Sequence, residues 1–156
     1  MLPIVHEWFE HAKTGEVSVF NFPPMRKPAQ DQIRKLSKGS TCLLFLYDDR
    51  ILAGEFKVGS IKKVHSEDFM RKFKEKAYEV SSSKFPSKGQ WCWIIEFTDL
   101  RVFKRPLSED ELRQIFGEIL GKSASMRPLQ YTQIVEERLV DTIKIILMVL
   151  RFMEKR

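Results

Sequence analysis

The sequence has little of what would cross-link a protein or anchor it in a membrane. Only 2 of its 156 residues are cysteines, and both Cys42 and Cys92 lie inside apolar runs. Thiols in such runs behave as small buried hydrophobes rather than as half of a disulfide or as metal ligands. The longest uncharged apolar run, Ile145 to Leu150, is far too short to span a bilayer. These absences predict a reducing, intracellular setting and no membrane partner.

The first residues also lack the basic start and continuous apolar stretch of a secretory signal, because Glu7 and Glu10 interrupt them. No repeat, low-complexity tract or linker is visible, and no pair of His or Cys residues has the spacing of metal ligands. We therefore expect no metal or other cofactor. With 43% hydrophobic residues the chain can bury a core of its own, which favours a single cytoplasmic domain over residues 1–156.

The charge is modest in total but uneven along the chain. The net charge is +6 and the pI about 9.4. Residues 26–84 hold 14 of the 27 Lys and Arg residues but only 8 of the 21 Asp and Glu residues. A polyanion such as RNA or DNA is one explanation of this surplus, and a solvated, soluble surface is the other. Composition alone leaves both open.

The strongest local pattern is a long β-hairpin from Thr41 to Val64. Its first half is apolar and β-rich, Asp48 to Arg50 have the composition of a turn, and the second half alternates through Gly54 and Gly59. Glycines inside a strand indicate a bulge or a sharply coiled sheet.

Flanking segments have equally simple patterns. Apolar residues recur at three- and four-residue spacing where we predict helices, over residues 3–12, 28–36, 66–78, from 108 onward and 135–153. Ser66 and Ser108 are the predicted N-terminal caps of two of these helices. Further strands are predicted over residues 16–22 and 91–103. This order is typical of an α+β protein with mostly antiparallel pairing, in which a small curved β-barrel is flanked by helices.

The arrangement resembles the PUA-like superfamily, which includes PUA, ASCH, EVE and YTH domains, and is similar to an archaeal PUA-like domain family of unknown function. The likeness rests on four pieces in order: a helix followed by Thr14-Gly15-Glu16 and a strand; LSKGSTCLLFLYDDRILAGEFKVGSIKKV; WCWIIEFTDLRVFKRPLSEDEL; and MRPLQY. Together they cover most of the chain. The resemblance implies a nucleic-acid-binding fold with a ligand pocket.

The same resemblance implies an alternative, an ASCH-like amidohydrolase acting on a nucleoside or another small amide. Such enzymes use a Lys and a Thr near the first strand and a Glu from the sheet. Here the position of the lysine holds Val17. Ser18 and Glu55 are the residues that could still belong to a catalytic set.

A binding module needs aromatic rings on which bases stack, beside cations that neutralise phosphates. The candidates are Asn21, Phe22, Arg26 and Lys27 around the Pro-Pro loop, Trp91 and Trp93 on one face of a strand, and Arg127, Gln130 and Tyr131 in the late segment. Each set has a structural alternative: a buried Phe22, a core position for the two tryptophans, and a plain connecting segment.

The leading hypothesis is a non-catalytic module that binds RNA or a modified nucleotide between the first strand, the Pro-Pro loop and residues 127–131. Further cations could follow a nucleic-acid backbone: Lys62, Lys63, Arg71, Lys72, Lys74 and Lys76. The broad apolar face of the C-terminal helix could be buried within the chain or could seat a second subunit, so a homodimer is a further possibility.

Overall fold

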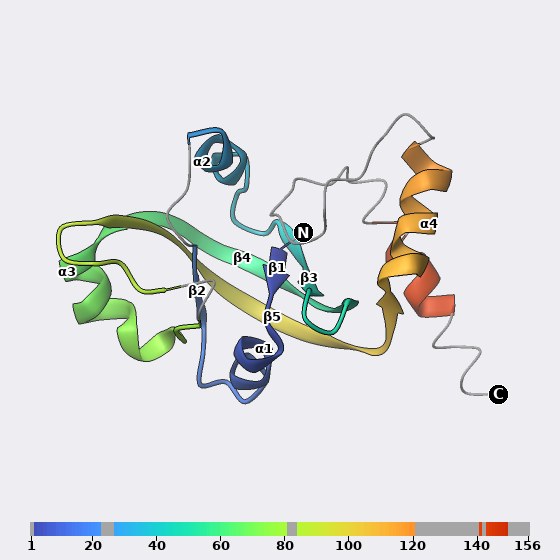
Figure 1. Cartoon of the computed structure of the whole chain (residues 1–156), viewed down its shortest axis with the longest axis horizontal. Coiled ribbons are helices and arrows are strands. Elements are labelled where there is room, and N and C mark those ends of the chain that lie inside the picture. The colour runs from blue at the N-terminus through green and yellow to red at the C-terminus, as the bar shows by residue number, and fades with distance from the viewer. Residues whose placement is uncertain (1, 23–26, 81–83, 121–140, 142, 150–156) are drawn as a thin grey trace. The chain divides into compact units, whose positions relative to one another are not determined.

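The computed structural model describes residues 2–22, 27–80, 84–120, 141 and 143–149 (Figure 1). Its elements follow the order β1 (Leu2–Ile4), α1 (His6–Lys13), β2 (Val19–Asn21), α2 (Lys27–Arg34), β3 (Thr41–Leu46), β4 (Ile51–His65), α3 (Ser66–Asp68), β5 (Trp91–Ser108) and α4 (Glu109–Leu120). Helix α3 continues as a π-helical turn, Phe69–Phe73, and a 3-10 turn, Lys74–Lys76. Residues 143–149 are also helical.

The strands form one mixed sheet in the order β1-β3-β4-β5-β2. Strand β2 pairs antiparallel with β5, whereas β1 pairs parallel with β3. The protein is therefore α+β, as predicted, but its sheet is not wholly antiparallel. Within the described residues the order ends at β1 and β2 with no recorded pairing between them, so a closed barrel stays a prediction.

The predicted start of the first helix at Pro3 is wrong. Leu2 and Ile4 are buried, and the carbonyl of Ile4 accepts a hydrogen bond from the Tyr47 amide. Pro3 thus lies in an edge strand, where a missing N–H costs no ladder bond. The helix begins instead at His6.

The predicted hairpin is confirmed, because β3 and β4 are neighbours in the sheet and join through residues 47–50. Arg50 in this turn has a φ of 57°. Gly59 shows why a glycine lies within β4: a Cβ there would come within 2.9 Å of the backbone oxygen of Glu96 on β5. The left-handed residue in the sheet is Asp99 on β5, with a φ of 53°, rather than a glycine.

Contacts divide the chain into two compact units, and strands β3, β4 and β5 each have residues in both. The first contains described residues of 2–4, 43–55 and from 101 onward, and the second contains those of 5–42 and 56–100. Because three strands are shared between the units, a single domain over the whole chain stays a proposal.

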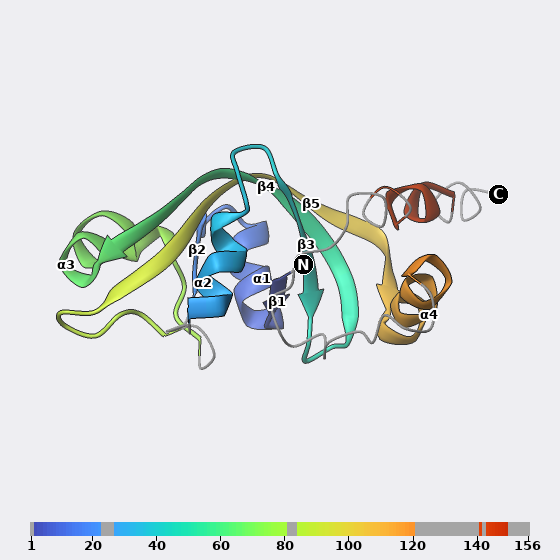
Figure 2. The same ribbon diagram turned by 90° about the horizontal axis from the view of Figure 1, so that it is seen from above.

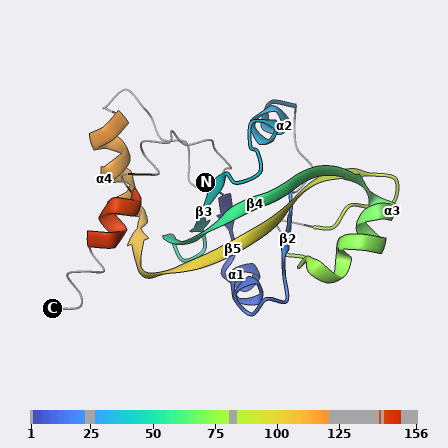
Figure 3. The ribbon, with the colours of Figure 1, turned by 180° about the vertical axis from the view of Figure 1, so that it is seen from behind.

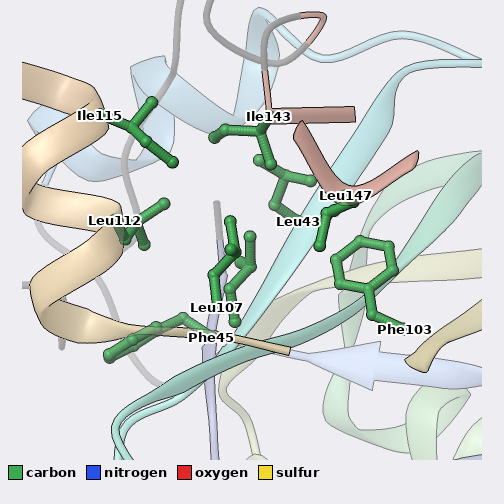
Figure 4. Packing of buried hydrophobic residues seen from close by; sticks show 9 residues of the cluster. Leu43, Phe45, Phe103, Leu107, Leu112, Ile115, Ile143 and Leu147 are labelled. Atoms are coloured by element: carbon green, nitrogen blue, oxygen red, sulfur yellow. The ribbon is translucent and has the colours of Figure 1, made fainter. Parts of the chain in front are cut away.

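The first unit has a hydrophobic core between the sheet and two helices (Figure 4). Ile143 and Leu147 of the C-terminal helix are buried in it, so this part of the helix follows the first of its two alternatives, burial within the chain. Ile145, Met148 and Val149 on the same helix are exposed. The buried cluster consists of Leu43, Phe45, Leu52, Phe103, Leu107, Leu112, Ile115, Ile143 and Leu147.

The second unit has helices on both faces of its strands. Helices α1 and α2 lie on one side of β4 and β5 (Figure 2), where Trp8 packs against Phe20 and Phe97. Helix α3 follows the end of β4 (Figure 3). The turns after it bury Phe69 and Phe73 against the other side of the sheet, together with Cys92.

Two helix starts test the predicted caps. Ser108 and Glu111 form a capping box, in which each side chain accepts the other's backbone N–H at 3.2 Å. The predicted cap at Ser66 is wrong: His65 caps this helix by accepting the Glu67 amide, while the Ser66 hydroxyl accepts the Gly89 amide.

Both cysteines are buried free thiols, as predicted. Burial raises the pKa of each thiol to about 11. No helix among the described residues combines the length and the hydrophobicity needed to cross a membrane.

Candidate nucleic-acid interface

The side chains near the start of β5 separate onto two faces. Cys92 and Ile94 belong to the buried cluster with Val64. Trp91 and Trp93 therefore point to the opposite face, because successive side chains of a strand alternate. On β4 the same rule places Lys63 and His65 with the tryptophans, and His65 does contact Trp91.

Trp93 is half-buried under helix α2. Its indole Nε1–H donates to Oε1 of Gln30 at 3.3 Å, and the guanidinium of Arg34 lies 5.6 Å from its ring centroid. Gln30 and Arg34 are one helical turn apart, so both reach the same ring. Arg34 also pairs with Asp31 at 3.7 Å on the exposed side of the helix.

Trp91 lies two residues away on the same face and is 57% exposed. Its ring meets that of His65 nearly at a right angle, with centroids 5.2 Å apart. The His65 Nδ1 accepts the Glu67 amide at 3.3 Å, so a neutral His65 carries its proton on Nε2. The structural alternative, a core position for both tryptophans, is therefore wrong for Trp91.

Asn21 and Phe22, which precede the Pro-Pro loop in the sequence, contribute less surface than expected. The Phe22 amide donates to the Trp93 carbonyl at 2.9 Å, yet the Phe22 ring is buried against Phe20. Asn21 pairs with Ile94 and so faces the opposite side of the sheet, where its amide donates to the Lys84 carbonyl at 3.2 Å. Both residues shape the end of β2 rather than offering a surface.

The remaining predicted residues differ in what can be said of them. Lys27 is exposed at the start of α2. Arg26, Arg127, Gln130 and Tyr131 lie outside the described residues. The structure thus brings together Trp91, Trp93 and α2 and adds three residues that sequence reasoning missed: Gln30, Arg34 and His65. For these three residues, the sequence held one usable indication: Gln30 and Arg34 are four residues apart, which puts them on the same face of a helix.

The exposed cations of this unit are not equivalent. Lys62 already forms an ion pair with Glu96 at 2.7 Å, and its ammonium group lies over the Phe73 ring. That contact, with a hydrogen bond from Ser60, lowers the pKa of Glu96. Lys63, on the face of the tryptophans, is exposed and has no recorded ion pair with a described residue.

The alternative catalytic residues lie in different units. Glu55 in the first unit is 6% exposed, with Arg101 at 3.4 Å from Oε1 and Lys144 at 3.6 Å from Oε2. Ser18 in the second unit is half-buried, and its backbone amide donates to the Lys76 carbonyl. Among the described residues, neither Glu55 nor Ser18 contacts a partner that would make a pair of nucleophile and base.

Comparison with solved structures decides the fold. An ASCH protein from Zymomonas mobilis superposes with a TM-score of 0.67 at 10% identity, covering 92% of this chain and 91% of that chain. A variant of the same protein gives 0.69 at 11% identity over 93% of both chains. The chain has a PUA-like fold.

A second PUA-like structure superposes less well. The human THYN1 protein, solved in complex with DNA containing 5-methylcytosine, gives a TM-score of 0.53 at 15% identity over 83% of this chain and 78% of that chain. No protein-family model and no curated protein matches the sequence. At these identities the PUA-like likeness establishes the fold and leaves function to the site.

Proposed function

We propose that this PUA-like chain is a non-catalytic module that binds RNA or a modified nucleotide at the surface formed by Trp93 and helix α2. The observation that carries the proposal is the setting of the Trp93 ring. Gln30 fixes its edge, and Arg34 lies over its ring with an exposed side chain. A base can stack on such a ring while the guanidinium neutralises a phosphate.

The charge distribution supports the same partner. Lys27, Arg34, Lys35 and Lys38, on and just after α2, are exposed, and they belong to the basic stretch of residues 26–84. A surface with this charge attracts polyanions over a range set by salt. The THYN1 structure, whose fold is similar, contains DNA. Arg26, Arg127, Gln130 and Tyr131 remain proposed contacts.

The test is fluorescence anisotropy with labelled oligonucleotides of RNA and of DNA, with and without modified bases. Wild-type protein should bind, and its affinity should fall as salt rises, because bound phosphates release counterions. Trp93→Ala should weaken binding by about tenfold, since stacking on one aromatic ring contributes about 1–3 kcal/mol. Trp93→Phe should recover part of the loss.

Met70→Ala is the matched control. Met70 is an exposed apolar residue of the same unit, on the helical segment after α3. Its truncation should leave affinity unchanged within twofold. Absence of salt-sensitive binding to every oligonucleotide would reject the proposal.

One observation favours a second candidate, the ASCH-like amidohydrolase. Glu55 is a buried carboxylate with cations on both sides, and among described residues its Oε2 accepts no hydrogen bond. The Oε2 without a hydrogen bond has a lone pair available to take a proton, as a general base requires. Turnover of acetylated nucleosides that Glu55→Gln abolishes would support this activity, and no turnover across a nucleoside panel would remove it.

A homodimer through the C-terminal helix also stays a proposal. Ile145, Met148 and Val149 on this helix are exposed apolar residues. Sedimentation of a clean monomer at micromolar concentration would exclude self-association through them.

A further inference from the structure

The exposed Trp91 ring next to the Trp93 surface raises the question of how much nucleic acid the interface holds. We propose that it takes a single strand of at least two nucleotides, with one unpaired base on Trp93 and the neighbouring base on Trp91. This inference rests on the proposed function and deepens it, because it names the ligand class as single-stranded and longer than a mononucleotide.

The spacing of the two rings carries the first step. Residues two apart on a strand are separated by about 7 Å, whereas consecutive bases in a duplex rise by about 3.4 Å. Bases that occupied both rings would be pulled apart to about twice their duplex spacing. A paired, stacked duplex cannot supply them, and an extended single strand can.

The uneven burial along this face carries the second step. Along this face of β5 the exposure rises toward the start of the strand. Phe97 and Ile95 are buried, Trp93 is half-buried and Trp91 is 57% exposed. Helix α1 contacts Phe97 and helix α2 contacts Trp93. Trp91 lies beyond both contacts, and its ring meets His65 edge to face while the residue stays 57% exposed.

Polar groups beside Trp91 suit the sugar-phosphate chain. Lys63 is on this face and has no recorded ion pair with a described residue, whereas its neighbour Lys62 faces the other way and is paired with Glu96. The His65 Nε2–H is a donor, since Nδ1 already accepts the Glu67 amide. A cation and a donor next to an open ring are what one further nucleotide needs.

The experiment compares ligands of increasing length. Anisotropy or calorimetry would measure wild-type affinity for a mononucleotide, a dinucleotide, a tetranucleotide and a duplex of the same sequence, each as RNA and as DNA. The dinucleotide should bind at least tenfold tighter than the mononucleotide, and the duplex should bind less tightly than the single strand.

Trp91→Ala should reduce the ratio of dinucleotide to mononucleotide affinity to near one, and Lys63→Ala should lower the salt slope for the longer ligands. Lys104→Ala, which removes one exposed lysine of the other unit, is the charge-matched control and should change neither.

Equal affinity for the mononucleotide and the tetranucleotide would overturn the inference while leaving the proposed function intact. So would tight duplex binding, or a length dependence that Trp91→Ala does not alter. Absence of binding to every ligand would reject the proposed function itself, and this inference with it.

Discussion

Replacing Gly59 by Ala should destabilise the protein, although glycine-to-alanine changes in regular structure commonly do the reverse. Gly59 does not have a positive φ, so its backbone imposes no requirement for glycine. The requirement is spatial: a Cβ would lie 2.9 Å from the backbone oxygen of Glu96 and 3.6 Å from Cγ2 of Thr98. Because the nearer atom belongs to the backbone of β5, that strand must move.

The magnitude follows from two opposing effects. Overpacking of this kind costs about 1–3 kcal/mol, and the lower entropy of the unfolded alanine chain returns about 0.4–1 kcal/mol. The net free energy of unfolding should fall by about 1–2 kcal/mol. With a urea m-value of about 2 kcal/mol per molar, the midpoint should fall by about 0.5–1 M.

Gly117→Ala is the matched control in the same urea titrations. Gly117 lies in helix α4, has no positive φ and has open space where a Cβ would be added. Alanine there should stabilise by about 0.5–1 kcal/mol through helix propensity. If Gly59→Ala were as stable as wild type, or shifted in the same direction as Gly117→Ala, the close approach of β4 and β5 at Glu96 would be refuted.

The remaining predictions concern a cap, the thiols and acid stability. Ser108→Ala should cost about 1 kcal/mol in thermal or urea unfolding, because it breaks the capping box with Glu111; an unchanged midpoint would contradict the cap. Cys42 and Cys92 should react with a thiol reagent at pH 8 only after denaturation, since with a pKa of about 11 roughly one thiol in a thousand is ionised; fast native reaction would count against their burial. The Lys62 ammonium lowers the pKa of Glu96, and the Ser108 amide lowers that of Glu111. A depressed carboxyl pKa stabilises the fold above the unfolded value of about 4.3 and ceases to do so as the pH falls through the folded value. The melting temperature should therefore fall as the pH is lowered below about 4, and it should fall less steeply in Glu96→Gln. A pH profile of that variant identical to wild type would contradict a stabilising role for the Glu96 carboxylate.

The features that sequence predicted well are local. The hairpin from Thr41 to Val64 and the cap at Ser108 depend on residues close together in the chain. Strand β1 was missed because its partner β3 is about 40 residues away, and Pro3 suits a helix start as well as an edge strand.

Part of the candidate site could be predicted from the sequence. Alternation alone puts Trp91 and Trp93 on one face and sets Asn21 and Phe22 on opposite faces. What alternation cannot give is which helix covers that face. The contact between Gln30 and Trp93 joins residues 63 positions apart, and the exposure of Trp91 follows from where α2 ends its contact with the sheet.

The most direct test of nucleic-acid binding at the tryptophan face uses the three indole N–H groups of the protein as reporters. Trp8 is 1% exposed on the buried face of α1, whereas Trp93 and Trp91 lie on the proposed interface. In ¹H–¹⁵N spectra, titration with a single-stranded oligonucleotide should shift the Trp91 and Trp93 indole signals and leave that of Trp8 in place. Binding that leaves both interface signals unmoved, or that moves Trp8 most, would contradict the account.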